Sequence, residues 1–493
     1  MSNYKHGSYG EFAASIGQTA ALSSTIAVYI GTAPVNLIRG YASADIVNNP
    51  VLLKSMADVR AKIGYSSAWG DFTLCEAFSA HFAGADNIGP IVAINVLDPA
   101  VHKDEEDTSV QLTFTNGRAT IDSNTIILDT LVLADKVEGT DYAVSYDFGK
   151  GKVIIDSIGE TVISGTVTAT FSNVDPDAVE VADIVGGINI NGEGSYYGIG
   201  CVSLVYQTLN VIPNLLGAPG WSDKKEVYDA LVSASAKING HWDALVVADI
   251  PVADVSGGAG TIKDAVTWKT TNGYTSERSK VCWPMVAVGG GTVYHLSTLT
   301  IWRMMTVDAT HDGVPMETPS NKGIPAVKQY FGATSTNRGF DQQNGNELNA
   351  AGITTAVFFG GTWVLWGAHT AAYKCGAVAD NRVIFDTSIR MMMHITNSFQ
   401  RDWALTIDQP MTKALADTIK NREQEKLDAL AGMGALIGTP EVRFDETANS
   451  TAALVEGDFV WDAEGTPTPP WKSGTLRMAY TTAGFNTYFG EEG

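Results

Sequence analysis

The stretch VAVGGGTVYH (286–295) places three consecutive glycines and a threonine directly after an apolar run. A glycine-rich loop after a buried strand can bind phosphate, because its exposed backbone N–H groups can surround the anion. A phosphate loop also needs a lysine followed by serine or threonine, and this stretch has no lysine. We therefore interpret the glycines as a tight turn that leaves a buried strand.

Two further side chains could serve catalysis or metal binding. Asp249 ends the apolar run ALVVADIP (244–251), and ligands often bind where the strands of an α/β sheet end. His369 follows an apolar hairpin in WGAHT. Neither has a partner motif nearby, so we interpret Asp249 as a turn aspartate and His369 as a hydrogen-bonded structural residue. A carboxylate base or metal ligand at Asp249 and a ligand role for His369 are the alternatives.

Other signatures of catalysis and cofactor binding are absent from the sequence. It contains no GxSxG and no HExxH, and GEGSYYG (192–198) has tyrosine where a dinucleotide-binding loop needs its third glycine. Four widely spaced cysteines form no CxxC pair, which is typical of reduced thiols rather than a zinc site. The sequence therefore predicts no catalytic residue, no cofactor-binding residue, no cofactor and no metal.

Composition narrows the class of protein further. Among 493 residues, 54 acidic and 32 basic side chains give a net charge of −22, which argues against a nucleic-acid coat. The uncharged stretch 348–373 has apolar runs on both sides of Gly360 and Gly361, which predicts a β-hairpin rather than a membrane span. We expect a soluble protein that contacts no nucleic acid directly and does not insert into a membrane.

These candidate residues lie on a predicted α/β framework. Apolar, β-branched runs predict buried strands, and helical spacing of apolar residues predicts packed helices. Asp223 and Glu226 are expected to form a capping box at the start of one helix. The alternation predicts a mainly parallel or mixed sheet with helices packed on it. The predicted strands are 25–34, 90–97, 244–251 and 281–288, and the predicted helices are 51–63, 71–83, 223–238, 387–399 and 411–430.

Two kinds of segment differ from this framework. Residues 102–181 are rich in Thr, Val, Ile, Asp and Gly in alternating runs, which predicts an all-β unit inserted into the α/β chain. Both termini have the pattern of extended arms, the first with scattered aromatics and the last with alternating apolar residues that predict a late strand. These arm residues are Tyr4, Tyr9 and Phe12, and Leu476, Met478 and Tyr480.

Several stretches, taken in order, resemble contractile tail sheath proteins. The family's late hairpin usually closes on Trp-Gly-Asn-Arg-Thr, and here Ala368 and His369 replace the Asn-Arg pair. The resemblance extends over nearly the whole chain outside 102–181. The stretches that carry it are YKHGSYGEF, STIAVYIGTAPVN, PVLLKSMADVRAKIG, LLGAPGWSDKKEVYDAL with the later WDALVVADIP, HDGVPMETPSNKGI, LNAAGITTAVFFGGTWVLWGAHT and LDALAGMGALIG.

The resemblance implies a structural polymer. Sheath subunits stack as rings or helical strands around an inner tube, then contract and drive the tube through a target cell envelope without nucleotide hydrolysis. The terminal arms of such subunits add strands to the sheets of neighbours. The implied division is an N-terminal interaction arm (1–20), an α/β core in two parts (21–100 and 186–375), an inserted, outward-facing β-rich domain (102–181), a C-terminal sheath domain (380–473) and a C-terminal interaction arm (474–493).

The same resemblance implies the partners and the location. The partners would be further copies of this chain, the inner tube protein, and baseplate and tail terminator proteins. The location would be a virion tail or a phage-derived contractile particle, assembled in the cytoplasm of a bacterial host. No nucleotide or other cofactor is implied, which agrees with the missing signatures above.

Two other classes of function remain open on the sequence. The first is an α/β enzyme, such as a hydrolase, in which Asp249 and His369 would meet in one cleft. The second is a different structural role, as a tube, baseplate or surface-layer protein. The positions of Asp249 and His369 in the fold distinguish the enzyme from the structural readings.

Overall fold

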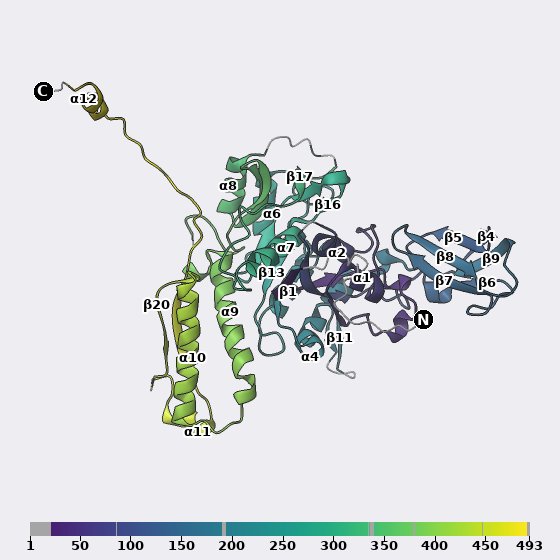
Figure 1. Ribbon diagram of the computed structural model, residues 1–493, viewed down its shortest axis with the longest axis horizontal. Coiled ribbons are helices and arrows are strands. Elements are labelled where there is room, and N and C mark those ends of the chain that lie inside the picture. The colour runs from purple at the N-terminus through teal and green to yellow at the C-terminus, as the bar shows by residue number, and fades with distance from the viewer. Residues whose placement is uncertain are drawn as a thin grey trace, which may run out of the picture.

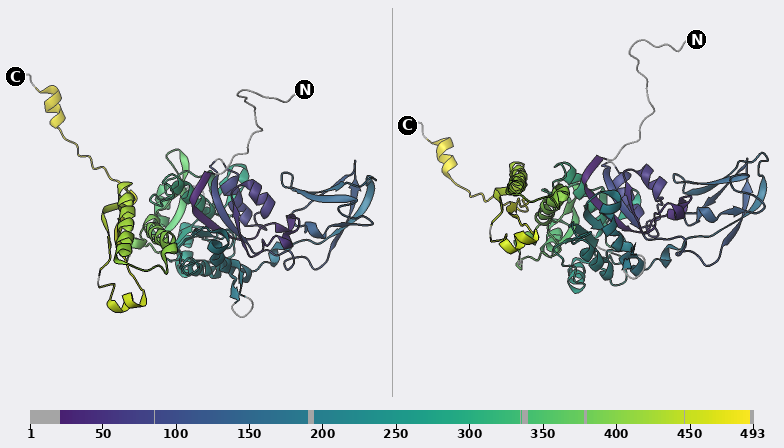
Figure 2. Two further views of the ribbon diagram at one scale, coloured as in Figure 1. Left: turned by 60° about the horizontal axis from the view of Figure 1, so that its bottom comes forward. Right: turned by 90° about the horizontal axis from the view of Figure 1, so that it is seen from below.

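The computed structural model describes residues 21–84, 86–189, 194–333, 335, 340–377, 380–445 and 447–490. Figure 1 shows a central α/β core, a β-rich unit on one side, and a unit built on two long helices on the other. A C-terminal extension leaves the helical unit and leads away from the body in every view (Figures 1 and 2).

An eight-stranded mixed sheet forms the core, in the order β19-β18-β14-β13-β12-β1-β3-β2. Its interior pairs are parallel, and its two edge strands, β2 and β19, pair antiparallel with their neighbours. Ala27 to Ile30 of β1 are all fully buried, so both faces of the sheet are covered. The strands are β1 Ala21–Gly31, β2 Pro50–Leu53, β3 Ile88–Asn95, β12 Pro213–Gly217, β13 Leu245–Asp249, β14 Ser279–Cys282, β18 Ile353–Phe359 and β19 Thr362–Trp366.

Helices pack on this sheet as the apolar spacing predicts. The most buried is α7, Leu296–Ala309, which packs against β1 and β13 and against α2. The other core helices are α1 Met56–Lys62, α2 Leu74–Phe82, α3 Val181–Val185, α4 Val205–Leu209, α5 Lys225–Ala234, α6 Ile262–Thr271 and α8 Gln342–Ala350. Two small sheets complete the core, made of β10 Gly187–Asn189 with β11 Ser195–Tyr197, and of β15 Met285–Val288 with β16 Val293–Tyr294 and β17 Ala326–Tyr330.

Residues 108–171 form six strands in two three-stranded antiparallel sheets, in the orders β4-β9-β6 and β5-β8-β7. Their inward side chains, among them Phe114, Tyr142 and Phe171, make a hydrophobic cluster separate from that of the core. The strands are β4 Thr108–Phe114, β5 Arg118–Asp122, β6 Val132–Leu133, β7 Tyr142–Asp147, β8 Lys152–Ser157 and β9 Gly165–Phe171.

The C-terminal unit pairs two long helices with a two-stranded ribbon. Helix α9 (Asp386–Trp403) starts in the core, and α10 (Lys413–Gly432) runs beside it (Figure 1). Strand β20 (Leu436–Arg443) packs on α10 and pairs antiparallel with β21 (Asp462–Pro467). The short helices of this part are α11 Thr451–Glu456, between the two strands, and α12 Ala483–Phe489, near the end of the chain.

Three local predictions were wrong. The predicted helix 51–63 starts only at Met56, because the residues before it form the edge strand β2 against β3. The predicted strand 281–288 is two strands, β14 and β15, which belong to different sheets on either side of Pro284. The expected capping box is absent, since Asp223 lies before α5 and instead accepts Lys224 Nζ at 2.9 Å.

The two predicted glycine turns are confirmed. Gly360 and Gly361 join β18 to β19 with φ of 61° and 87°, a conformation that strongly favours glycine. Gly290 and Gly291, with φ of 84° and 86°, turn the chain from β15 into β16. Open space surrounds the Cα atoms of the three glycines 289–291, so they form a surface turn.

Candidate assembly interface

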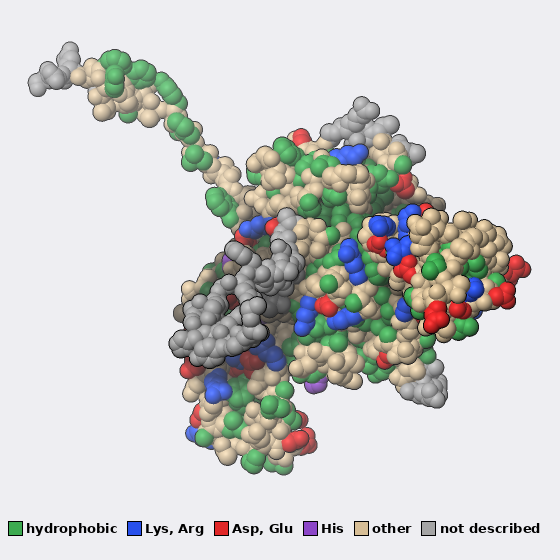
Figure 3. All heavy atoms as spheres, turned by 45° about the vertical axis from the view of Figure 1, so that its right-hand side comes forward, with side chains coloured by type: hydrophobic (Ala, Val, Ile, Leu, Met, Phe, Trp, Pro, Cys, Tyr) green, Lys and Arg blue, Asp and Glu red, His purple; other side chains and the backbone are tan. Residues whose placement is uncertain are grey.

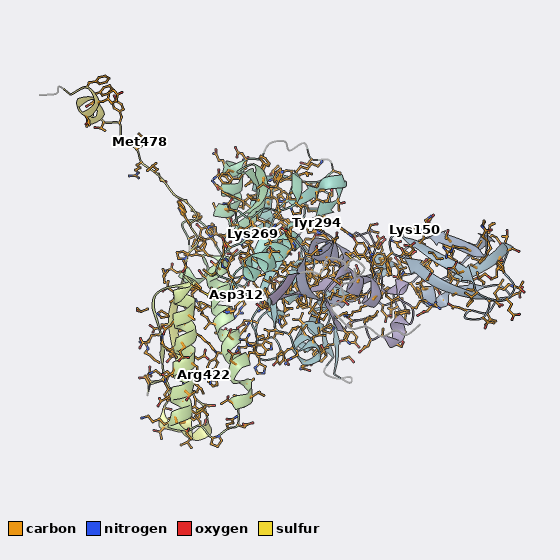
Figure 4. All side chains as sticks on the ribbon, viewed as in Figure 1. Lys150, Lys269, Tyr294, Asp312, Arg422 and Met478 are labelled. Atoms are coloured by element: carbon orange, nitrogen blue, oxygen red, sulfur yellow. The ribbon has the colours of Figure 1, made fainter. Side chains whose placement is uncertain are left out.

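The C-terminal extension exposes a row of large apolar side chains. Its last tie to the helical unit is Thr468, whose N–H donates to the carbonyl of Ala435 at 3.0 Å. The side chains of Leu476, Met478 and Tyr480 are then 92, 91 and 80 % exposed. Figure 4 shows Met478 on the extension, well away from the body. Contiguous exposed apolar side chains on a folded protein mark an interaction site.

The helix that ends the extension has the same character. Phe485, Tyr488 and Phe489 of α12 are exposed, and their rings contact one another rather than the body. Figure 3 shows hydrophobic side chains along the length of the extension. Between residues 468 and 490 the charged side chains are Lys472 and Arg477, both basic, in a chain whose net charge is −22.

The structure corrects the strand predicted at the C-terminus. Residues 470–480 are extended chain without a strand partner among the described residues, because no sheet edge of the same molecule lies beside them. A single strand cannot satisfy its backbone hydrogen bonds alone. Tyr4, Tyr9 and Phe12 of the predicted N-terminal arm lie outside the described residues.

A sheet edge of the complementary kind is present in the C-terminal unit. The β20–β21 ribbon runs from the pair Leu436–Pro467 to the pair Arg443–Asp462, and no third strand pairs with it in the described part of the chain. Each strand of this ribbon therefore has one open edge. Open edges with unpaired N–H and C=O groups are templates for pairing with another strand.

Beside this ribbon lies an apolar hollow of about 340 Å³. Its walls come from α9, α10 and both strands, with further residues from the run that precedes β21. The apolar lining residues are Ile395, Phe399, Leu427, Val442, Phe459, Val460, Trp461 and Ala463. The sequence did not indicate this hollow, because its walls come from four separate segments.

Two buried ion pairs fix α9 to the core. Lys280 Nζ on β14 lies 2.7 Å from Asp386 Oδ2, which also accepts Thr318 Oγ1 at 3.1 Å. One turn further along α9, Arg390 donates to both carboxylate oxygens of Asp308 at the end of α7. All four charged side chains are nearly or fully buried. The helix that carries the C-terminal unit is thus rigidly anchored.

Asp249 belongs to a buried polar cluster at the start of α7. Its Oδ1 accepts the Ser297 N–H at 3.0 Å, and the Ser222 hydroxyl lies 3.4 Å from its Oδ2, while burial raises the pKa of Asp249 to about 6. Glu76 accepts the N–H of His295 at 2.8 Å and contacts its Nδ1 at 2.7 Å. Burial alone would lower the pKa of His295, but the Glu76 carboxylate outweighs it and raises this pKa to about 9. The carboxylates stabilise the N-terminus of α7.

His369 has a different set of partners. Its ring stacks on Tyr373 at a centroid distance of 3.5 Å and on Phe385 at 5.2 Å. Because a carbonyl can only accept, Nδ1–H of His369 donates to Ile384 O at 2.8 Å, and burial lowers the pKa of His369 to about 4. The structural interpretation of His369 is confirmed. None of the partners given for His369 is shared with Asp249, and the two line no common cavity.

Within the described ranges, no group of three or more His, Cys, Asp or Glu side chains is placed to hold a metal ion. None of the helices in the same ranges is long and apolar enough to cross a membrane.

Comparisons with known proteins agree on one class. No profile of a known protein family matches the chain. It is 26% identical to the tail sheath protein of Burkholderia phage BcepMu over 93% of this chain and 95% of that protein. It is 24% identical to the tail sheath protein of Escherichia phage P2 over 62% of this chain and 72% of that protein.

Solved structures share the fold. A chain in the structure of the anti-feeding prophage baseplate matches with a TM-score of 0.56 at 14% identity, covering 97% of this chain and all of that one. A chain of the contracted sheath complex of an extracellular contractile injection system, PVC, matches with a TM-score of 0.55 at 12% identity, covering 98% of this chain and all of that one.

Proposed function

This chain is a structural, non-enzymatic member of the contractile tail sheath family, and we propose that its copies polymerise around an inner tube and contract to drive that tube through a target cell envelope. The single observation that carries the polymerisation is the pairing of two features in one chain. An apolar extension leaves the body without a strand partner, and a two-stranded ribbon on the same chain keeps open edges.

Strand addition between copies would join these two features. Residues 474–493 of one subunit would lie along the ribbon of another, and residues 1–20 would form a second arm of the same kind. Backbone hydrogen bonds provide most of the affinity in such pairing, so it tolerates rotation of the bodies while the chain near the joint stays extended. Leu476, Met478 and Tyr480 would face the acceptor, as would Tyr4, Tyr9 and Phe12 from the N-terminal arm.

The anchoring of α9 supports the mechanical part of the proposal. Because Asp386 and Arg390 tie the helix to the core through buried ion pairs, the core and the C-terminal unit move together. Contraction would then exchange one set of contacts between rigid bodies for another, while the arms keep the copies connected. The free-energy difference between the two packings would supply the work, without a nucleotide.

The β-rich residues 102–181 complete the proposed arrangement as an inserted domain that faces outward. Their separate hydrophobic cluster and their position to one side of the core support this assignment (Figure 1). Baseplate and tail terminator proteins would contact the two ends of the polymer. The particle would be a phage tail or a phage-derived contractile device that is assembled in the host cytoplasm.

Removing the C-terminal arm tests the proposal. A chain that lacks residues 474–493 should fold, because the exposed side chains removed make no core contacts. We expect its sedimentation to show monomers under conditions in which the full chain pelets as polymer. Replacing Leu476, Met478 and Tyr480 together by Ser should have the same effect, and Ala479→Ser should not. Normal polymers from the truncated chain would overturn the role of this arm.

A further inference from the structure

The apolar hollow beside the β20–β21 ribbon has no polar group that needs a partner. Glu423, its one charged lining residue, already accepts from Trp403 Nε1 and Lys426 Nζ, each at 2.6 Å. Trp461 Nε1 donates to Ala416 O at 3.3 Å, which leaves the indole ring as wall. Phe399 lies with its ring centroid 6.1 Å from that of Trp461. An occupant of this hollow must therefore be apolar.

The ribbon has one apolar face and one charged face at this point. Val442 and Ala463 are opposite each other in the pairing, and both line the hollow. Since side chains alternate along a strand, Asp462 and Glu464 must lie on the other face. The segment 436–467 carries seven acidic side chains and one basic side chain, so the second face lies in a strongly acidic surrounding.

The C-terminal extension has the matching alternation. In an extended strand, Leu476, Met478 and Tyr480 share one face, and Arg477 lies on the other. The apolar row fits the hollow, and Arg477 fits the acidic face that carries Asp462 and Glu464. Cross-strand pairs of opposite charge stabilise a sheet, whereas like charges opposite each other destabilise it.

We propose that the hollow between α9, α10 and β21 is the seat for Leu476, Met478 and Tyr480 of a second copy of this chain, with Arg477 of that copy paired to the acidic outer face of β21. The inference rests on the proposed function and adds the side chains that set the face and the register of the arm. A second copy is the occupant because the extension of the same molecule leads away from its own ribbon (Figures 1 and 2).

Cysteine cross-linking in the full chain tests this seat. Cys375 is the one exposed native cysteine among the described residues, so it is first replaced by Ser. Ala463→Cys is then combined with Met478→Cys in one chain, and with Ala479→Cys in the control, because residue 479 would face away from the hollow. We expect assembled material with the 463/478 pair to give an oxidised ladder of dimers and higher multimers, at least tenfold stronger than the 463/479 control.

Each other outcome has a distinct meaning. Polymers that form without the 463/478 ladder, or with equal ladders for both pairs, would overturn the seat but not the proposed function. A cross-link confined to the monomer band would show that the arm occupies its own hollow, which also overturns it. Failure of the unmodified chain to polymerise would contradict the proposed function itself.

Charge reversal gives a second, independent readout. Arg477→Glu should reduce the pelleted fraction of the full chain several-fold, because it places a carboxylate opposite Asp462 and Glu464. Adding Asp462→Arg and Glu464→Arg to that variant should restore polymerisation. Restoration would support the paired outer face, and an unchanged pelleted fraction in Arg477→Glu would contradict it.

Discussion

At the scale of single residues, buried charges hold the fold in place of chemistry. Lys280 donates to Gly367 O, to His369 O and to Asp386, so its ammonium is fully satisfied inside the core. Breaking a buried pair leaves an uncompensated charge, which costs more than the pair itself contributes. The apolar context of Lys280 in the sequence gave no sign of a partner 106 residues away.

Replacing one member of this pair should therefore be costly. Asp386→Asn is expected to lower the free energy of unfolding by about 3–5 kcal/mol, because Lys280 stays buried and charged. The double variant with Lys280→Met should lose clearly less than the sum of the two single variants. Urea unfolding of the truncated, monomeric chain measures all three, and additive losses would contradict the coupling.

His295 gives stability a dependence on pH. Its pKa is about 9 in the fold, against about 6.5 when unfolded, so its contribution is complete below pH 6.5 and lost as pH rises through 9. We expect wild type to exceed His295→Gln by about 1–3 kcal/mol at pH 6.5, with a much smaller difference at pH 9.5. Lys269, whose pKa burial lowers to about 8, titrates in the same range, so the two proteins are compared at each pH. A constant difference would contradict the role of the Glu76 contact.

Sequence reasoning at this scale found what residues do not do more readily than what they do. It favoured a non-catalytic Asp249, and its partners in the fold are structural. The turn role assigned to it was wrong, because Asp249 accepts the Ser297 N–H at the start of α7. That contact joins residues 48 apart, and no local pattern encodes it.

At the scale of elements, the buried strands could be predicted and their limits could not. The runs that became β1, β3 and β13 are apolar on both faces, which is the pattern of strands covered on both sides. The boundary errors have a physical cause in tertiary pairing. Pro50 to Leu53 satisfies a helical pattern as well, but pairing with β3 makes it an edge strand.

Gly64 provides a test of an element boundary that the sequence did predict. It follows α1 with φ of +82°, and an added Cβ would lie 2.3 Å from the carbonyl oxygen of Pro34. We expect Gly64→Ala to lower the free energy of unfolding by more than about 2 kcal/mol, since strain and a backbone clash act together. Gly70→Ala is the control, because open space surrounds Gly70, and its change should stay within about 0.5 kcal/mol. Equal losses in urea unfolding would contradict this explanation.

At the scale of the whole molecule, the account joins an acidic body to a basic, apolar arm. The net charge of −22 keeps separate bodies apart at high concentration, while the arm with Lys472 and Arg477 is attracted to the acidic ribbon of another copy. The family could be predicted from the order of the motifs. The hollow and the open ribbon edge could not, because both arise from segments that meet only in the fold.

The central claim is that copies of this chain polymerise into a hollow sheath, and negative-stain electron microscopy of the purified full chain tests it most directly. We expect striated, hollow cylinders from the full chain and separate particles from the chain that lacks 474–493. Separate, uniform particles from the full chain across protein concentrations and ionic strengths would contradict the account.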